Sequence, residues 1–164
     1  MNKFRQAFER LLERVSLLLM ILLALVVIVG VMFRKAGMPL VWYDEVASIL
    51  LAWLTYYGSC LAALRQAHIG FPKFVQAVDP EFRWPLLLIR EVFVIGFFAL
   101  AAWAGWRVVT VLDGFYLVSL PWLPRQFTES VIPISSVLFI VAELLSFAEL
   151  WRDPARLPAE VEQP

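Results

Sequence analysis

Four stretches of the sequence are long and apolar enough to cross a lipid bilayer, and they lie at about residues 15–33, 44–64, 84–109 and 131–150. The hydrocarbon core of a bilayer is about 30 Å thick and a helix rises about 1.5 Å per residue, so roughly 20 residues complete one crossing. The first stretch contains no charged residue, which favours its insertion into lipid. The sequence therefore predicts an all-α integral membrane protein with four transmembrane helices.

Composition supports the same class. Hydrophobic residues make up 62% of the chain and charged residues 17%, whereas soluble domains average about 45–50% and about 25%. A chain of 164 residues cannot bury that much apolar surface inside one soluble core. The excess must face an apolar surrounding, and a bilayer is the simplest one.

The four segments predict a single four-helix membrane domain over residues 1–150, in which short connections give a compact bundle. Residues 151–164 form a polar, proline-rich tail that we expect to be frayed or disordered. The basic N-terminus also fits a secretory signal, but the apolar run after it is too long for one. Arg34 and Lys35 follow that run, where a signal would place small residues before a cleavage site. The first segment is therefore predicted to be a retained span.

Lysine and arginine residues predict the orientation in the membrane. With the N-terminus in the cytoplasm, nine of them fall in the cytoplasmic parts (residues 1–14, 65–83 and 151–164) and three in the opposite loops. Cytoplasmic loops carry an excess of these residues in membrane proteins. Both termini are therefore predicted to be cytoplasmic.

Two segments place apolar residues on one side of a helix. At the N-terminus, Phe4, Phe8, Leu11 and Leu12 recur at helical spacing among charged residues. This pattern predicts an amphipathic extension on the membrane surface that continues into the first span. Residues 71–78, between the second and third spans, form another one-sided stripe. A cytoplasmic surface helix and a loop resting on the lipid headgroups both fit this second stripe.

Ionisable residues flank the second span. Asp44 and Glu45 stand at its start, where we expect Asp44 to cap the helix and Glu45 to lie in the first, electropositive turn. Arg65 and His68 stand at its other end, where the helix dipole favours cations. These helix-end effects explain all four residues without a ligand. The alternatives are a partner contact or an ion site at the acids, and a proton relay at His68.

Arg90 and Glu143 are charges inside predicted spans, where each is costly. A pair that bridges two helices and fixes their packing is one explanation. Pairing with a partner protein and a position on an ion pathway are the others. A stripe of small residues on the second span is predicted to serve helix packing; it comprises Ser48, Ala52, Thr55, Ser59 and Ala62.

Several classes of protein are excluded or disfavoured. The net charge is zero, so nothing suggests nucleic acid as a partner. The single cysteine, Cys60, cannot form a disulfide or a cysteine metal cage within the chain, and the single histidine cannot provide both axial ligands of a haem. The sequence contains no nucleotide-binding loop, nucleophile triad or zinc helix. We therefore predict a protein that is not an enzyme and holds no cofactor or metal.

A set of short motifs resembles one transporter family. The pattern W-x-D-E at Trp42, with Asp44 and Glu45, is followed by Trp53, Gly58 and R-x-x-H-I at Arg65 and His68. This resembles the small membrane subunit (DctQ-like) of tripartite ATP-independent periplasmic (TRAP) transporters. The stretches LPWLP at 120–124 and IPIS at 132–135 resemble that family's outer loop and the start of its fourth span. The resemblance covers roughly residues 10–150, and Ser135 departs from it where the family often has glycine.

The resemblance implies a part in a secondary transporter of the bacterial inner membrane. Such systems import organic acid anions, including dicarboxylates, other carboxylates and sialic acids, with a sodium gradient. A periplasmic substrate-binding protein captures the anion, and a large multi-span subunit holds the substrate and sodium sites. The small multi-pass subunit, surrounded by membrane lipid, acts as a fixed scaffold. By this resemblance Glu45, Arg65 and His68 are structural or partner-facing residues.

A self-sufficient small transporter that works as a dimer is the alternative prediction. Four-helix exporters of that kind use an acid embedded in the first span. The first span has no acid here, so Glu143 would have to take that role.

Overall fold

The computed structural model describes residues 3–65 and 80–152, and in this part of the chain the regular structure is helical. The helices are α1 (Lys3–Lys35), α2 (Tyr43–Leu64), α4 (Pro80–Val111), the short α5 (Arg125–Glu129) and α6 (Val131–Arg152). Four helical segments have the length and hydropathy of membrane spans. The predicted all-α membrane fold with four spanning helices is confirmed.

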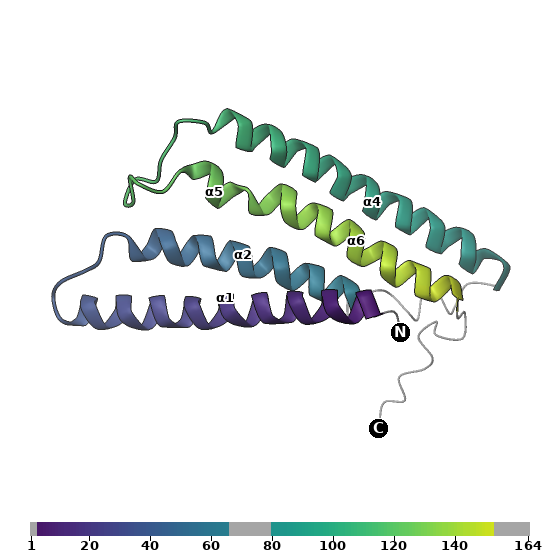
Figure 1. The fold of residues 1–164 in the computed structure, drawn as a ribbon, viewed down its shortest axis with the longest axis horizontal. Coiled ribbons are helices and arrows are strands. Elements are labelled where there is room, and N and C mark those ends of the chain that lie inside the picture. Colours follow the sequence, from purple (N-terminus) through teal and green to yellow (C-terminus); the bar gives the residue numbers. More distant parts are fainter. Residues whose placement is uncertain (1–2, 66–79, 153–164) are drawn as a thin grey trace, which may run out of the picture.

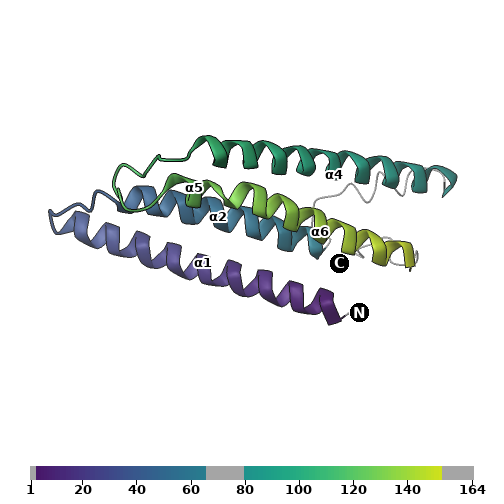
Figure 2. The same cartoon turned by 45° about the horizontal axis from the view of Figure 1, so that its top comes forward.

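The four long helices form a row in which α1 packs on α2, α2 on α6, and α6 on α4. Figures 1 and 2 show α1 and α4 at the two edges of this row, with α2 and α6 between them. The compact bundle expected from short connections is therefore more open than predicted. Consecutive helices are neighbours in each half of the chain, and the packing of α2 on α6 is the most extensive helix contact between the halves.

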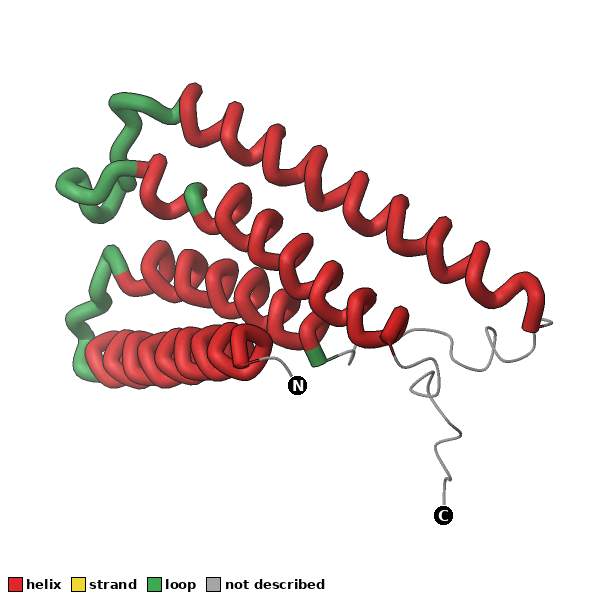
Figure 3. The backbone as a smooth tube through the Cα atoms, turned by 45° about the vertical axis from the view of Figure 1, so that its right-hand side comes forward, coloured by secondary structure: helices red, strands yellow, loops and turns green. Residues whose placement is uncertain are grey.

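The two ends of the row differ, and we name them by what they contain. The loop end holds the connection between α1 and α2 and the connection from α4 through α5 to α6 (Figure 3). The terminal end holds the start of α1 and the last turns of α2 and α6 (Figure 1).

Helix α1 is continuous over 33 residues. At about 1.5 Å per residue it is about 50 Å long, so it exceeds the roughly 30 Å of hydrocarbon that one span must cross. The predicted amphipathic extension is the start of this one helix. Phe8 and Leu12 from its apolar side are buried against the other helices, while Phe4 and Leu11 are exposed. Half of the apolar stripe therefore contacts protein, where the sequence predicted a membrane surface.

The main core lies toward the terminal end and takes side chains from all four long helices. It comprises Phe8 and Leu12 of α1, Cys60, Ala63 and Leu64 of α2, and Phe139 and Ala142 of α6, with Val94 and Phe98 of α4 packed against them. The rings of Phe98 and Phe139 stack with centroids 3.7 Å apart. Lipid tails are as apolar as these side chains, so moving the side chains out of lipid gives little hydrophobic gain. Close packing between the helices is therefore the main stabilising term here.

Two glycines allow close approach nearer the loop end. A Cβ on Gly30 of α1 would overlap the ring of Tyr43 at the start of α2. A Cβ on Gly105 of α4 would lie 2.8 Å from Ile132 Cγ2 and 3.0 Å from Pro133 Cδ, both on α6. Larger side chains would push these helices apart.

Candidate functional site

At the loop end, the first turn of α2 is joined to the connection between α4 and α5. The carboxylate of Glu45 accepts hydrogen bonds from the backbone N–H of Ser119, at 2.9 Å, and from the Ser119 hydroxyl. Arg125 lies close enough to interact electrostatically with the same carboxylate. Glu45 therefore holds an irregular loop against α2 and has its partners within the chain.

Helix α2 begins at Tyr43, one residue before the predicted start. Trp42 occupies the N-cap position and makes no side-chain cap hydrogen bond, while Asp44 and Glu45 lie in the first turn. The expected cap by Asp44 is therefore wrong, because this residue is already inside the helix. Its charge still lies near the positive end of the helix dipole. Asp44 is exposed and Trp42 is half-buried.

Trp53 connects the middle of α2 to α5. Its indole N–H donates to the backbone carbonyl of Thr128 at 3.0 Å, and its ring lies 5.2 Å from the ring of Phe127. An indole N–H in an apolar layer needs an acceptor, and the carbonyl satisfies it. Trp53 thereby fixes the short α5 over α2.

At the terminal end, the last turn of α2 receives polar contacts from both neighbouring helices. Arg65 pairs with Glu9 at 2.8 Å and with Glu13 at 3.3 Å, both on α1. The hydrogen bond to Glu9, followed by that to Glu13, raises the pKa of the Arg65 guanidinium above its ordinary value. Arg65 therefore stays charged at physiological pH. His68 lies outside the described residues, as do the predicted surface stripe at 71–78 and the tail from residue 153.

The final carbonyl groups of α2 also have donors from other helices. Arg5 Nη2 on α1 donates to the carbonyl of Leu64 at 2.6 Å. The hydroxyl of Ser146 on α6 donates to the carbonyls of Ala63 and Leu64, each at 3.2 Å. The last carbonyls of a helix lack partners within it, and an apolar surrounding makes that costly. These contacts join α1, α2 and α6 at one point.

Arg90 and Glu143, which the sequence places inside spans, form an ion pair between α4 and α6. The Glu143 side chain is 5% exposed and that of Arg90 is 54% exposed. The pair therefore has one buried end and one end at the surface of the chain. This geometry agrees with the bridge that fixes packing, the first of the explanations that the sequence left open.

Glu91 belongs to the same cluster and was not singled out from the sequence. It is 6% exposed, and its Oε1 atom is buried without a hydrogen-bond partner. Glu91 shares the packed face of α4 with Leu87, Val94 and Phe98, but α4 is apolar on most sides, so the sequence pattern does not identify this face. Ser119 lies in an irregular loop, where no periodic pattern identifies a partner for Glu45 either.

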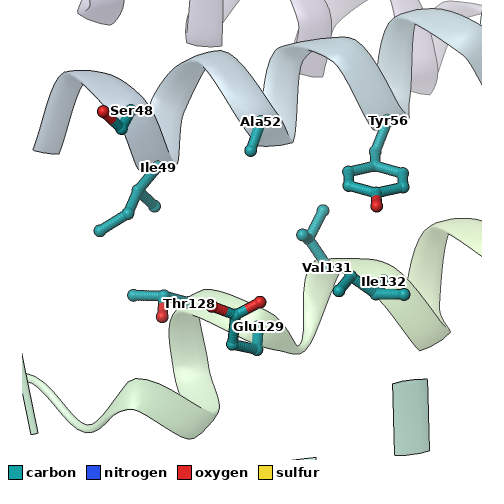
Figure 4. A pocket seen from close by; sticks show the side chains of 8 residues that line it. All are labelled: Ser48, Ile49, Ala52, Tyr56, Thr128, Glu129, Val131 and Ile132. Carbon is teal, nitrogen blue, oxygen red and sulfur yellow. The ribbon is translucent and has the colours of Figure 1, made fainter. Parts of the chain in front are cut away.

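A groove of about 290 Å³ lies between α2 and the turn from α5 to α6. Figure 4 shows side chains of the two elements facing each other across it. Its walls are largely apolar, and its polar groups include Ser48 and Glu129. The volume is just below the range of about 300–1,000 Å³ that small-molecule sites usually occupy. Glu129 would repel an organic anion, so this groove is poorly suited to hold one.

The small-residue stripe of α2 is not packed inside the chain along its whole length. Ser48, Ala52 and Thr55 are exposed, and the hydroxyls of Ser48 and Thr55 donate to carbonyls of their own helix. A Cβ on the nearby Gly58 would meet no atom within 4 Å. This face of α2 therefore has room for another helix to approach closely.

Among the described residues, no group of three or more His, Cys, Asp or Glu side chains could hold a metal ion. Glu45 at the loop end and Arg65 at the terminal end are both engaged with other groups of the chain. The site thus resembles a set of helix-joining contacts more closely than a pocket for a small molecule.

Comparison with known proteins identifies the family. A search of curated protein sequences gives no match. Residues 23–153 match the family described as tripartite ATP-independent periplasmic transporters, DctQ component. The match covers most of the chain and includes all four spans in whole or in part, so the resemblance suggested by the short motifs is confirmed. The chain belongs to the DctQ family, the small membrane component of TRAP transporters.

Proposed function

We propose that this chain is the scaffold subunit of a secondary transporter that imports organic acid anions with sodium. The anions would be dicarboxylates, other carboxylates or sialic acids. In this role the chain binds and braces a large multi-span subunit and helps a periplasmic substrate-binding protein to dock. The observation that carries the proposal is the family match over residues 23–153.

The distribution of charge supports a role that does not include binding the anion. Two arginines are paired with acids of the chain: Arg65 with Glu9 and Glu13, and Arg90 with Glu143. A carboxylate substrate in lipid needs uncompensated donors or cations. The groove beside α2 offers an acid, Glu129, in their place.

The row of helices supports a large partner. A broad apolar face of α4 is exposed, and its large members are Phe93, Phe97, Leu100 and Trp103. The exposed small residues of α2 offer a second, flatter face. Lipid can cover either face, but small residues in particular favour close helix contacts. We assign the face of α2 around Ala52, Thr55 and Gly58 to the large subunit.

The loop end is our candidate for docking the periplasmic protein. Its connection between α4 and α5 exposes Phe115, Tyr116, Val118 and Trp122. This loop is held in place by Glu45 through Ser119 and by a bridge between Tyr116 and Pro124. A loop with exposed aromatic groups and a fixed backbone is a suitable protein-binding surface, because little freedom is lost on binding.

The predicted orientation remains part of this proposal, with the terminal end in the cytoplasm and the loop end facing the periplasm of a bacterial inner membrane. Cysteine mapping tests it. In a Cys60→Ser background, Met38→Cys, which is exposed at the loop end, should react with a membrane-impermeant maleimide in intact spheroplasts. Arg10→Cys should react only after the membrane is opened. The reverse pattern would refute the orientation.

The dimeric-transporter alternative finds less support. Its embedded acid would be Glu143, and Glu143 is paired with Arg90. Purification in a mild detergent distinguishes the two functions: a scaffold should co-purify with the large subunit of its system, whereas an exporter should run as a homodimer. Vesicles holding this chain, the large subunit and the binding protein should take up organic acids with sodium. Uptake by this chain alone would refute the scaffold role.

The α2 face has its own test. Ala52→Leu and Thr55→Leu should abolish co-purification of the large subunit while the isolated chain folds normally. Phe97→Leu on the α4 face is the matched control and should retain the complex. Retention of the large subunit by both α2 variants would show that the partner binds elsewhere.

A further inference from the structure

The contact between α4 and α6 contains two acids and one cation. Arg90 of α4 pairs with Glu143 of α6. Glu91, the next residue of α4, is also close enough to interact electrostatically with both Glu143 and Arg90. The single charge of Arg90 can compensate one carboxylate. Arg90 already donates a hydrogen bond to Glu143, so the charge of an ionised Glu91 would stay uncompensated.

Glu91 is the less exposed of the two α4 residues, and none of the described groups donates a hydrogen bond to its buried Oε1 atom. Its exposed fraction is 6%. A buried carboxylate is stable when it is paired and hydrogen-bonded, and otherwise it takes up a proton. Burial between two helices of a membrane protein strengthens this preference, because an unpaired charge is costly inside a membrane.

Other groups on the packed helices do not supply the missing charge. The hydroxyl of Ser146 on α6 donates to carbonyls of α2. Arg65 on α2 pairs with Glu9 and Glu13 of α1, and Arg5 donates to the carbonyl of Leu64. Among the described side chains, Arg90 is therefore the cation available to both acids.

We propose that Glu91 and Glu143 form a carboxyl pair that binds one proton at neutral pH, and that this proton resides on Glu91. The cluster is then electrically neutral, with a charged Arg90, an ionised Glu143 and a neutral Glu91. The proton comes from solvent when the carboxylate is buried on folding, and its binding to one oxygen forms a carboxylic acid. This site does not depend on the transport role of the chain.

Infrared spectroscopy tests the proposal directly, because a buried carboxylic acid has a carbonyl stretch well separated from that of a carboxylate. The full chain would be measured at neutral pH in a detergent without ester groups, since lipid esters absorb nearby. The wild-type spectrum should show one protonated carboxyl band, and Glu91→Gln should remove it. Glutamine matches a neutral glutamic acid in size, so this variant should fold.

Two further variants give results that a different proton site would not. Arg90→Gln removes the shared cation, so the band should gain intensity from a second acid. Glu143→Gln should remove the band, because Arg90 can then pair with an ionised Glu91. Glu13→Gln, on the exposed side of α1, is the control and should leave the band unchanged. Protection of the buried Cys60 thiol shows that each variant is folded. A wild-type spectrum without the band, or a band that survives Glu91→Gln, would overturn the proposal.

Discussion

The contact between α4 and α6 at Gly105 gives a sharp prediction about packing. A Cβ added at Gly105 would lie 2.8 Å from Ile132 Cγ2, 3.0 Å from Pro133 Cδ and 3.1 Å from Pro133 N. The Ile132 methyl group can move by rotation of its side chain. The proline atoms cannot, because the ring is fixed to the backbone of α6. Gly105→Ala must therefore shift α4 away from α6.

The magnitude follows from two opposing effects. Replacing a glycine within a helix by alanine stabilises the helix by about 0.8–1.0 kcal/mol. Overpacking a close contact costs about 1–3 kcal/mol. Gly96, also in α4, is the matched control, since a Cβ there would meet no atom within 4 Å. Both variants gain the same helix stabilisation, so the difference in free energy of unfolding between them should be about 1–3 kcal/mol.

The chain carries its own reporter for this measurement. Cys60 is its one cysteine and is 0% exposed, so it reacts with a thiol-specific fluorophore only after unfolding. On heating in a mild detergent, Gly96→Ala should unfold at or above the wild-type temperature. Gly105→Ala should unfold about 2–12 °C below Gly96→Ala, if the scale of about 2–4 °C per kcal/mol known for soluble domains of this size applies. Equal midpoints would refute the reasoning, because they would show that α4 and α6 have free space between them at this point.

The same assay checks three contacts that join other helices. Trp53→Phe leaves the carbonyl of Thr128 without its donor, and should reduce stability by about 1–3 kcal/mol; an unchanged midpoint would contradict a bond between α2 and α5. Glu45→Gln keeps an acceptor for Ser119 but loses the charge, so it should lower the midpoint less than Trp53→Phe and should expose the loop to proteolysis. Arg65→Ala removes ion pairs that are partly exposed, and its midpoint should lie within a few degrees of the wild-type value; a larger loss would show that this network is shielded from solvent.

The four spans could be predicted because they depend on properties that each segment carries by itself. A helix of about 20 apolar residues satisfies its own backbone groups in lipid, so length and the absence of charge suffice to identify it. The order of the helices in the row could not be predicted in this way. Helix α4 is apolar on most sides, and its pattern does not state which side meets α6.

The candidate site was predictable only in part, for a related reason. Arg90 and Glu143 are rare intramembrane charges, and their mutual attraction makes a pair the natural expectation. The role of Glu91 depends on the rotation of α4, since one residue along a helix turns the side chain by about 100°. The partner of Glu45 lies 74 residues away in an irregular loop, and that of Trp53 lies 75 residues away on a backbone carbonyl. Neither partner leaves a periodic trace in the sequence.

The arrangement of the helices bears directly on what the chain can do alone. A transport path within one protein needs helices that surround it, so that polar groups face one another across water. Here α1 and α4 stand at opposite edges of a row (Figure 2). The polar contacts instead join α4 to α6 at Glu143, and α2 to the connection before α5 at Glu45. Such contacts resist sliding of one helix against the next, and the scaffold role that we propose requires this resistance.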